Sequence, residues 1–279
     1  MTVTTRTNLA TRGSASSTTN WAALPGSGGA AAITNVTGDA YEGEKHNRVT
    51  WSTATTAVNG GLTYTEPSGL AANTQYAIQV WVRASKIQTV TLRAQFRDAS
   101  NAIVNTVTSA GVLLAANTWS QMTLTATSGA AVTNVVLTVE AATGGVIWGV
   151  GNTLDGDAVV IETGATVGAP FSGDTVDAAG IIYAWTGTAG ASTSTATTYV
   201  PQLALVTKTD APCDRVEITI TDLTPTENTA TIWRTSDGKR GAVRGARRIT
   251  MVTSEVVIDY EVPLGRTVTY ELEVTAGIN

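Results

Sequence analysis

The sequence predicts an all-β protein, and three observations carry this prediction. Only 14 % of the 279 residues are charged, well below the usual quarter, while β-branched Thr and Val and turn-forming Gly are abundant. Apolar and polar residues alternate along many short runs separated by turn residues, as in half-buried strands. No segment shows the apolar spacing of an amphipathic helix. We therefore expect two packed β-sandwiches.

The first predicted domain, residues 1–168, is a jelly-roll sandwich. In residues 74–85, Ile78 and Val80 face one side of a strand while Trp81 faces the other. Short alternating strands with turns between them are typical of sandwiches and jelly rolls. Further strands are expected at residues 90–98, 118–128, 133–142 and 157–163.

The second predicted domain, residues 205–279, is a small immunoglobulin-like or fibronectin type III-like sandwich. It opens with the alternating run VEITITDL, and a hairpin follows whose turn is Asp237-Gly238. The runs EVVIDYEVP and TVTYELEVT complete a set of strands that suits a sandwich of this size. Residues 169–204 are expected to be a structured connector between the two domains.

Composition argues against several classes of function. The net charge of −5 gives no general attraction to nucleic acid or an anionic membrane, and no apolar run reaches the roughly 18 residues of a membrane span. A Ser-His-Asp site would need His46, the single histidine, which we interpret as a solvated loop residue. One histidine and one cysteine cannot form a transition-metal site. We therefore assign no catalytic residue and expect no required cofactor.

Aspartates in two turn-like stretches leave two further uses open. Asp155 and Asp157 lie in LDGDAVV, and Asp174 and Asp177 lie in FSGDTVD. Glycoside hydrolysis needs only two carboxylates, so a shortage of histidine does not exclude it. Calcium takes several oxygen ligands, so Asp155 and Asp157 are candidates for a structural calcium site. The simplest interpretation is that these aspartates bond their own turns.

Trp81 is the most informative aromatic residue because it lies on the polar face of its strand. Arg83 shares this face, and we expect Gln95 of the following strand to share it too. A tryptophan among polar groups can stack on a sugar ring, so Trp81, Arg83 and Gln95 form a candidate carbohydrate site. The alternative is that another sheet or a loop covers this face.

The remaining aromatic residues of the first predicted domain are considered by their place in the sequence. Trp119 begins a strand after a turn, and we expect it in the core. Four more aromatic residues sit in or near Gly-rich stretches and are candidates for a loop-edge site, although periodicity does not orient them: Trp21, Tyr41, Trp51 and Trp148.

Three aromatic residues lie in the turn-rich stretch PFSGDTVDAAGIIYAWTGTAGASTS. A flexible linker needs no aromatic residues, so we expect Phe171, Tyr183 and Trp185 to make an interdomain or subunit contact. Trp185 should then be mostly buried.

The order of several motifs in the first domain resembles the jelly rolls of carbohydrate-binding modules. These motifs are RTNLAT, YAIQVWVRAS, ANTWSQMTLTAT and DGDAVVIE. The following stretch, with Phe171, Gly173, Asp174, Tyr183 and Trp185 in the pattern F-x-G-D then Y-x-W-x-G, resembles a segment of minor tail proteins of tailed phages that infect actinobacteria. The second predicted sandwich is similar to the one that follows in those proteins.

The resemblance implies a non-enzymatic structural protein of the virion, at the tail tip, synthesised in the host cytoplasm. It implies a homo-oligomer, a trimer or hexamer, with other phage tail proteins as partners. The jelly roll would contact host cell-wall carbohydrate, and no nucleic acid partner is expected. Two alternatives stay open: a stand-alone carbohydrate-binding module of a glycan-degrading system, and a carboxylate-dependent glycoside hydrolase.

Overall fold

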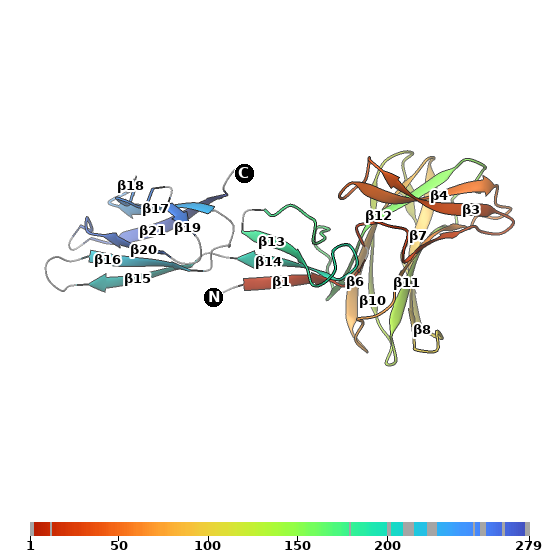
Figure 1. Cartoon of the computed structure of the whole chain (residues 1–279), viewed down its shortest axis with the longest axis horizontal. Helices are drawn as coiled ribbons and strands as arrows, with labels where there is room; N and C mark the ends of the chain where they lie inside the picture. The colour runs from red at the N-terminus through yellow and green to blue at the C-terminus, as the bar shows by residue number, and fades with distance from the viewer. Residues whose placement is uncertain are drawn as a thin grey trace. The chain divides into compact units, whose positions relative to one another are not determined.

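A computed structural model of the protein describes residues 3–11, 13–178, 180–199, 202–208, 215–221, 228–247, 249–251, 255–263 and 266–276. These residues form strands and turns, and none of them is helical, which confirms the all-β class (Figure 1). Contacts group the chain into two compact units. The N-terminal unit comprises residues 6–175 and 183–195, and the C-terminal unit comprises residues 1–5, 176–182 and 196–279.

Two antiparallel sheets make up most of the N-terminal unit. The five-stranded sheet has the order β10 (Ser120–Thr127), β6 (Gln75–Ala84), β12 (Thr153–Thr163), β4 (Lys45–Thr53), β3 (Ala30–Thr37). The six-stranded sheet has the order β2 (Trp21–Leu24), β5 (Gly61–Glu66), β11 (Asn134–Ala141), β7 (Gln88–Arg97), β8 (Ile103–Thr108), and β9 (Val112–Leu114) also pairs with β7. Together the sheets form the predicted jelly-roll sandwich (Figure 1).

Alternating side chains fill the space between the two sheets. Val80 and Val82 of β6 and Leu92 and Phe96 of β7 are buried, as the period-2 pattern predicts. The closing strand β12 begins at Thr153, before the run predicted from sequence, so its aspartates lie within a strand and not in a turn.

Three tryptophans whose orientation the sequence left open belong to this core. Trp51 and Trp148 are fully buried and stack with ring centroids 4.2 Å apart. Their indole N–H groups donate to the carbonyls of Pro25 and Gly60, which satisfies their one polar atom. Trp21 is 5 % exposed and packs edge-on against a buried tyrosine. These three tryptophans therefore do not form the loop-edge site that the sequence left open, because a glycine-rich neighbourhood does not determine where a side chain points.

The aromatic residues of the turn-rich stretch pack within the N-terminal unit. Phe171 is buried, with its ring centroid 5.8 Å from that of Tyr183. The half-buried Trp185 donates from its indole nitrogen to Asp174 Oδ1 at 2.9 Å. A Cβ placed on Gly173 would come within 2.3 Å of the Trp185 ring, so only glycine leaves room for the indole there. The spacing of these residues within the motif thus has a local structural cause, while a subunit contact stays a prediction.

Strands β1 (Val3–Asn8), β14 (Ser194–Tyr199) and β13 (Ile181–Trp185) form a sheet of order β1-β14-β13. In the C-terminal unit, one sheet has the order β15 (Gln202–Lys208), β16 (Arg215–Thr221), β20 (Glu255–Asp259). The other has the order β18 (Lys239–Ala242), β17 (Asn228–Ser236), β19 (Ile249–Met251), and β21 (Val268–Ala276) also pairs with β17.

The C-terminal unit has its own hydrophobic core, to which Ile218, Ile220 and Ile232 contribute fully buried side chains. The predicted hairpin is present, and its two turn residues, Asp237 and Gly238, have positive φ angles of 49° and 74°. This arrangement is consistent with the predicted small sandwich.

Candidate functional site

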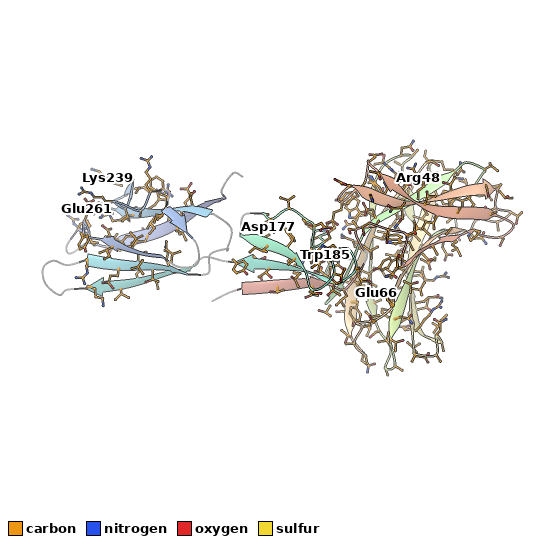
Figure 2. All side chains as sticks on the ribbon, viewed as in Figure 1. Arg48, Glu66, Asp177, Trp185, Lys239 and Glu261 are labelled. Atoms are coloured by element: carbon orange, nitrogen blue, oxygen red, sulfur yellow. The ribbon has the colours of Figure 1, made fainter. Side chains whose placement is uncertain are left out.

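Three charged side chains lie side by side on the outer face of the five-stranded sheet, which we call the polar face. The strand register pairs Asp155 of β12 with Arg48 of β4 on one side and with Arg83 of β6 on the other. Arg48, labelled in Figure 2, donates from Nε to Asp155 Oδ1 at 2.7 Å, and Arg83 donates from Nη2 to Asp155 Oδ2 at 2.7 Å. One buried carboxylate therefore holds two guanidinium groups.

The charges of Arg48, Arg83 and Asp155 are balanced by ion pairs. Asp155 is 1 % exposed and Arg83 is 6 % exposed, and Arg83 forms a second ion pair with Asp39. Pairing of this kind is what allows charges to be buried. It also occupies the Asp155 oxygens that a calcium ion would need. Among the described residues, no group of three or more acidic, histidine or cysteine side chains is placed to hold a metal ion. A calcium ion at Asp155 and Asp157 stays an untested prediction that this geometry does not favour.

Aromatic rings gather beside these charges. The loop between β3 and β4, residues 38–44, places the Tyr41 ring on that of Trp81, with centroids 3.6 Å apart and planes 11° apart. Trp119 meets Tyr41 edge-on at 6.3 Å and 66°. The guanidinium carbon of Arg83 lies 4.6 Å from the centroid of the Trp119 ring. We call Tyr41, Trp81 and Trp119 the aromatic cluster.

The aromatic cluster decides between two expectations for Trp81. Trp81 does point away from the core, as predicted, but the 38–44 loop covers it and leaves it half-buried. Tyr41, at 37 % exposure, is the ring that the loop presents to solvent. A loop therefore covers Trp81 itself, while Tyr41 and Gln121 beside it remain exposed.

Trp119 was wrongly expected in the core. It precedes β10, where Met122, Leu124 and Ala126 are buried, so the alternation of that strand directs Trp119 to the opposite, polar face. The signal was present in the sequence, because the odd-numbered positions of this run are otherwise polar. Tyr41 left no such signal, because it lies in a loop without periodicity.

Gln95 does not lie with Trp81 and Arg83. Strands β6 and β7 belong to different sheets, so the outward side of β7 is on the far side of the sandwich. Gln95 there accepts a hydrogen bond from Arg97 at 3.0 Å. The expectation of a shared face was wrong because consecutive strands were assumed to pair. The amides that do share the polar face are Gln79 and Gln121, which hydrogen-bond to each other.

His46 is not a solvated loop residue. It lies on β4 at 1 % exposure, with Nε2 3.5 Å from Asp155 Oδ2 and its ring edge-on to Trp119 at 5.8 Å. Burial lowers the pKa of His46 below its ordinary value, and Asp155 partly opposes this shift. The His46 imidazole therefore packs beneath the site, where burial disfavours its charged form.

Asp157 is buried under the 38–44 loop. Its Oδ2 accepts the backbone N–H groups of Tyr41 and Glu42, both at 2.9 Å, and its Oδ1 accepts that of Ala158 at 2.7 Å. Burial raises the pKa of Asp157 to about 8, and repulsion from Glu42 adds to the rise while the backbone donors oppose it. Asp157 thus contacts the loop backbone and not the solvent.

The three aspartates Asp155, Asp157 and Asp174 each have hydrogen-bond partners within the protein. Asp155 is held by two arginines, Asp157 by backbone amides, and Asp174 by the Trp185 indole. Among the described residues, no helix is long and apolar enough to cross a membrane.

Residues 7–145 match the model of a known protein family. That family is a carbohydrate binding domain. The matched range contains Tyr41, Trp81 and Trp119, and therefore the whole aromatic cluster. No curated protein matches the sequence.

Solved structures with similar folds include a xylan-binding domain of Xyn10C from Paenibacillus barcinonensis. It is 14 % identical, the alignment covers 58 % of this chain and 94 % of that one, and the TM-score is 0.41. A tailspike protein of bacteriophage CBA120 is 13 % identical, with coverage of 56 % and 21 % and a TM-score of 0.41. Modules of xylanase Xyn10B from Clostridium thermocellum are 15 % identical, with coverage of 57 % and 28 % and a TM-score of 0.42.

Proposed function

We propose that the N-terminal unit binds carbohydrate on the polar face, through Tyr41 and Trp119. The observation that carries this proposal is an exposed tyrosine ring next to a half-buried tryptophan, with arginine and glutamine groups around them. Sugar rings stack their C–H faces on aromatic rings, and their hydroxyls pair with charged and amide groups. The family match over residues 7–145 supports the same function.

The geometry of the rings favours single, soluble glycan chains. The planes of Tyr41 and Trp119 differ by 66°, so the two rings form a corner and not a flat platform. A flat crystalline surface would need coplanar rings to stack on it. The carboxylates of Asp155 and Asp39 balance Arg48 and Arg83, so we expect a neutral glycan.

The proposal is tested by affinity electrophoresis in a panel of soluble neutral polysaccharides: xylan, β-glucan, mannan and extracted bacterial cell-wall glycan. We expect retardation in at least one, with Tyr41→Ala and Trp119→Ala each weakening binding about tenfold, which is about 1.4 kcal/mol. Gln95→Ala on the opposite sheet is the matched control and should bind as the wild type does. Equal losses in all three variants, or no retardation at all, would contradict the proposal.

At a finer level, we propose that the chain is a non-enzymatic structural component of a phage tail tip whose polar face contacts host cell-wall glycan. The support is the motif of Phe171, Gly173, Asp174, Tyr183 and Trp185, whose members contact one another in the structure. The proposal includes a trimer or hexamer, partner tail proteins, and domains at residues 1–168, 169–204 and 205–279. Mass spectrometry of purified virions should detect the chain, and its absence would sink this finer proposal.

A further inference from the structure

We infer that Asp157 is a positioning residue that holds the 38–44 loop as a preformed wall of the site, so that Tyr41 contacts the ligand and Trp81 supports Tyr41 from beneath. The glycan part of this inference rests on the proposed function. The part that concerns the loop does not, because it can be measured without any ligand.

The hydrogen bonds of Asp157 fix the loop backbone directly. One oxygen, Oδ2, accepts two consecutive N–H groups, those of Tyr41 and Glu42, at 2.9 Å each. Two donors on one acceptor leave the peptide between them little freedom to rotate. Asp157 is completely buried, so water does not compete for these bonds.

The position of Asp157 at an irregularity of its strand explains how its carboxyl group contacts the 38–44 loop. The pairing of β12 with β6 shifts register between Asp157 and Val160, and Ala158 has a positive φ of 49°. A bulge of this kind bends the strand and redirects the side chains next to it. Asp157 is also the register partner of Trp81, which places its carboxylate beside the ring that Tyr41 covers.

Contacts at both ends of the loop support the same conformation. Gly38 donates its N–H to the carbonyl of Glu44 at 2.7 Å and so closes the loop. The Asp39 carboxylate pairs with Arg83, and its carbonyl accepts the Trp119 indole N–H at 3.2 Å. The Glu42 carboxylate accepts the hydroxyl of Thr175 at 2.7 Å. Hydrogen bonds and an ion pair therefore hold the loop backbone at its start, centre and end.

A preformed wall changes the roles of the two stacked rings. Trp81 lies under Tyr41 with centroids 3.6 Å apart, so its contact face is already occupied. Tyr41 itself stays 37 % exposed. A ring held in place before binding loses less conformational freedom when a ligand arrives, which favours affinity. Both Asp157 and Trp81 then act on the ligand only through Tyr41.

The experiment uses the full chain and reads out amide hydrogen exchange without ligand. Asp157→Ala should speed exchange at the Tyr41 and Glu42 amides at least tenfold, and Asp157→Asn, which keeps a carbonyl acceptor, should restore part of the protection. Gln121→Ala, which removes a polar-face hydrogen bond to Gln79 and not a bond to the loop, should leave both amides protected. Unchanged exchange at Tyr41 and Glu42 in Asp157→Ala would overturn the inference, and so would unchanged exchange in Asp157→Asn if the alanine variant does not fold.

Affinity for the polysaccharide that binds the wild type best is the second readout. Asp157→Ala should weaken it about tenfold, and Asp157→Asn should weaken it less. Asp98→Ala is the matched control, because Asp98 accepts the amides of Ser100 and Ala102 in a different loop. It should loosen that loop and leave affinity unchanged. Lost affinity in both alanine variants alike would overturn the positioning role, whereas absence of binding in the wild type would contradict the proposed function alone.

Discussion

The two outer faces of the N-terminal sandwich differ in what lies over them. Both faces are built by the polar positions of alternating strands. The face of the six-stranded sheet carries Arg93, Gln95 and Thr138. The polar face of the five-stranded sheet carries Arg83 and Trp81, and a loop adds Tyr41 on top of them. The difference shows that strand alternation makes a polar surface, while a candidate site needs a loop that brings aromatic rings to it.

The largest expected effect compares the arginines of the two faces. Arg83→Ala would remove a buried partner of Asp155, and losses of about 3 kcal/mol are typical of a broken buried pair; the retained Arg48 keeps the loss at that lower limit. Arg93 pairs with Glu140 at 3.3 Å in a partly exposed setting, so Arg93→Ala should cost about 1 kcal/mol or less. Urea unfolding of both variants measures the difference. Similar losses of unfolding free energy in the two variants would mean that the ion pairs of the two faces contribute equally to stability.

Asp157 should make the stability of the polar face depend on pH. Because the pKa of Asp157 is raised to about 8 from its ordinary value of 3.8, the folded state favours the protonated carboxyl. The corresponding stability is fully present below the ordinary pKa and is lost as pH rises through about 8. Between these values we expect the free energy of unfolding to fall by roughly 1.4 kcal/mol per pH unit relative to Asp157→Asn.

The comparison with Asp157→Asn isolates this group. Burial also raises the pKa of Glu66, labelled in Figure 2, and of Glu42, but both carboxyls remain in the variant. Glu42 repels Asp157, so its own titration shifts slightly in the variant. Unfolding free energies from pH 5 to pH 9 give the measurement. Parallel curves for the wild type and Asp157→Asn would show that Asp157 titrates normally.

The smallest expected effect compares two glutamines. Gln121 hydrogen-bonds Gln79 on the polar face, so Gln121→Ala should weaken polysaccharide binding about two- to fivefold, as for one modest hydrogen bond. Gln95→Ala should have no effect on binding, although Gln95 was the glutamine first assigned to the site. Titration calorimetry resolves a difference of this size. A loss for Gln95→Ala and none for Gln121→Ala would reverse the assignment of the faces.

The sequence predicted the sandwich and the orientation of most strand residues, because alternation is a local property. Val80 and Phe96 are buried and Trp81 faces outward, as expected. It did not predict which strands are neighbours, since β6 and β7 are adjacent in the chain but lie in different sheets. Gln95 was misplaced for that reason.

The contacts that loops make could not be predicted from the sequence. The stacking of Tyr41 on Trp81 depends on a loop conformation that Asp157 holds from a distant strand. The pairing of Trp51 with Trp148 is likewise a long-range contact. Such contacts leave no periodic trace, so they appear only once the chain is folded.

The most direct test of the account is an NMR titration of the full chain with the best-binding soluble polysaccharide. The account predicts progressive shifts of the Trp119 indole and Tyr41 amide resonances, while the amide resonances of Gln95 and Thr138 on the opposite face stay in place. Shifts confined to Gln95 and Thr138, with Trp119 and Tyr41 unmoved, would contradict it.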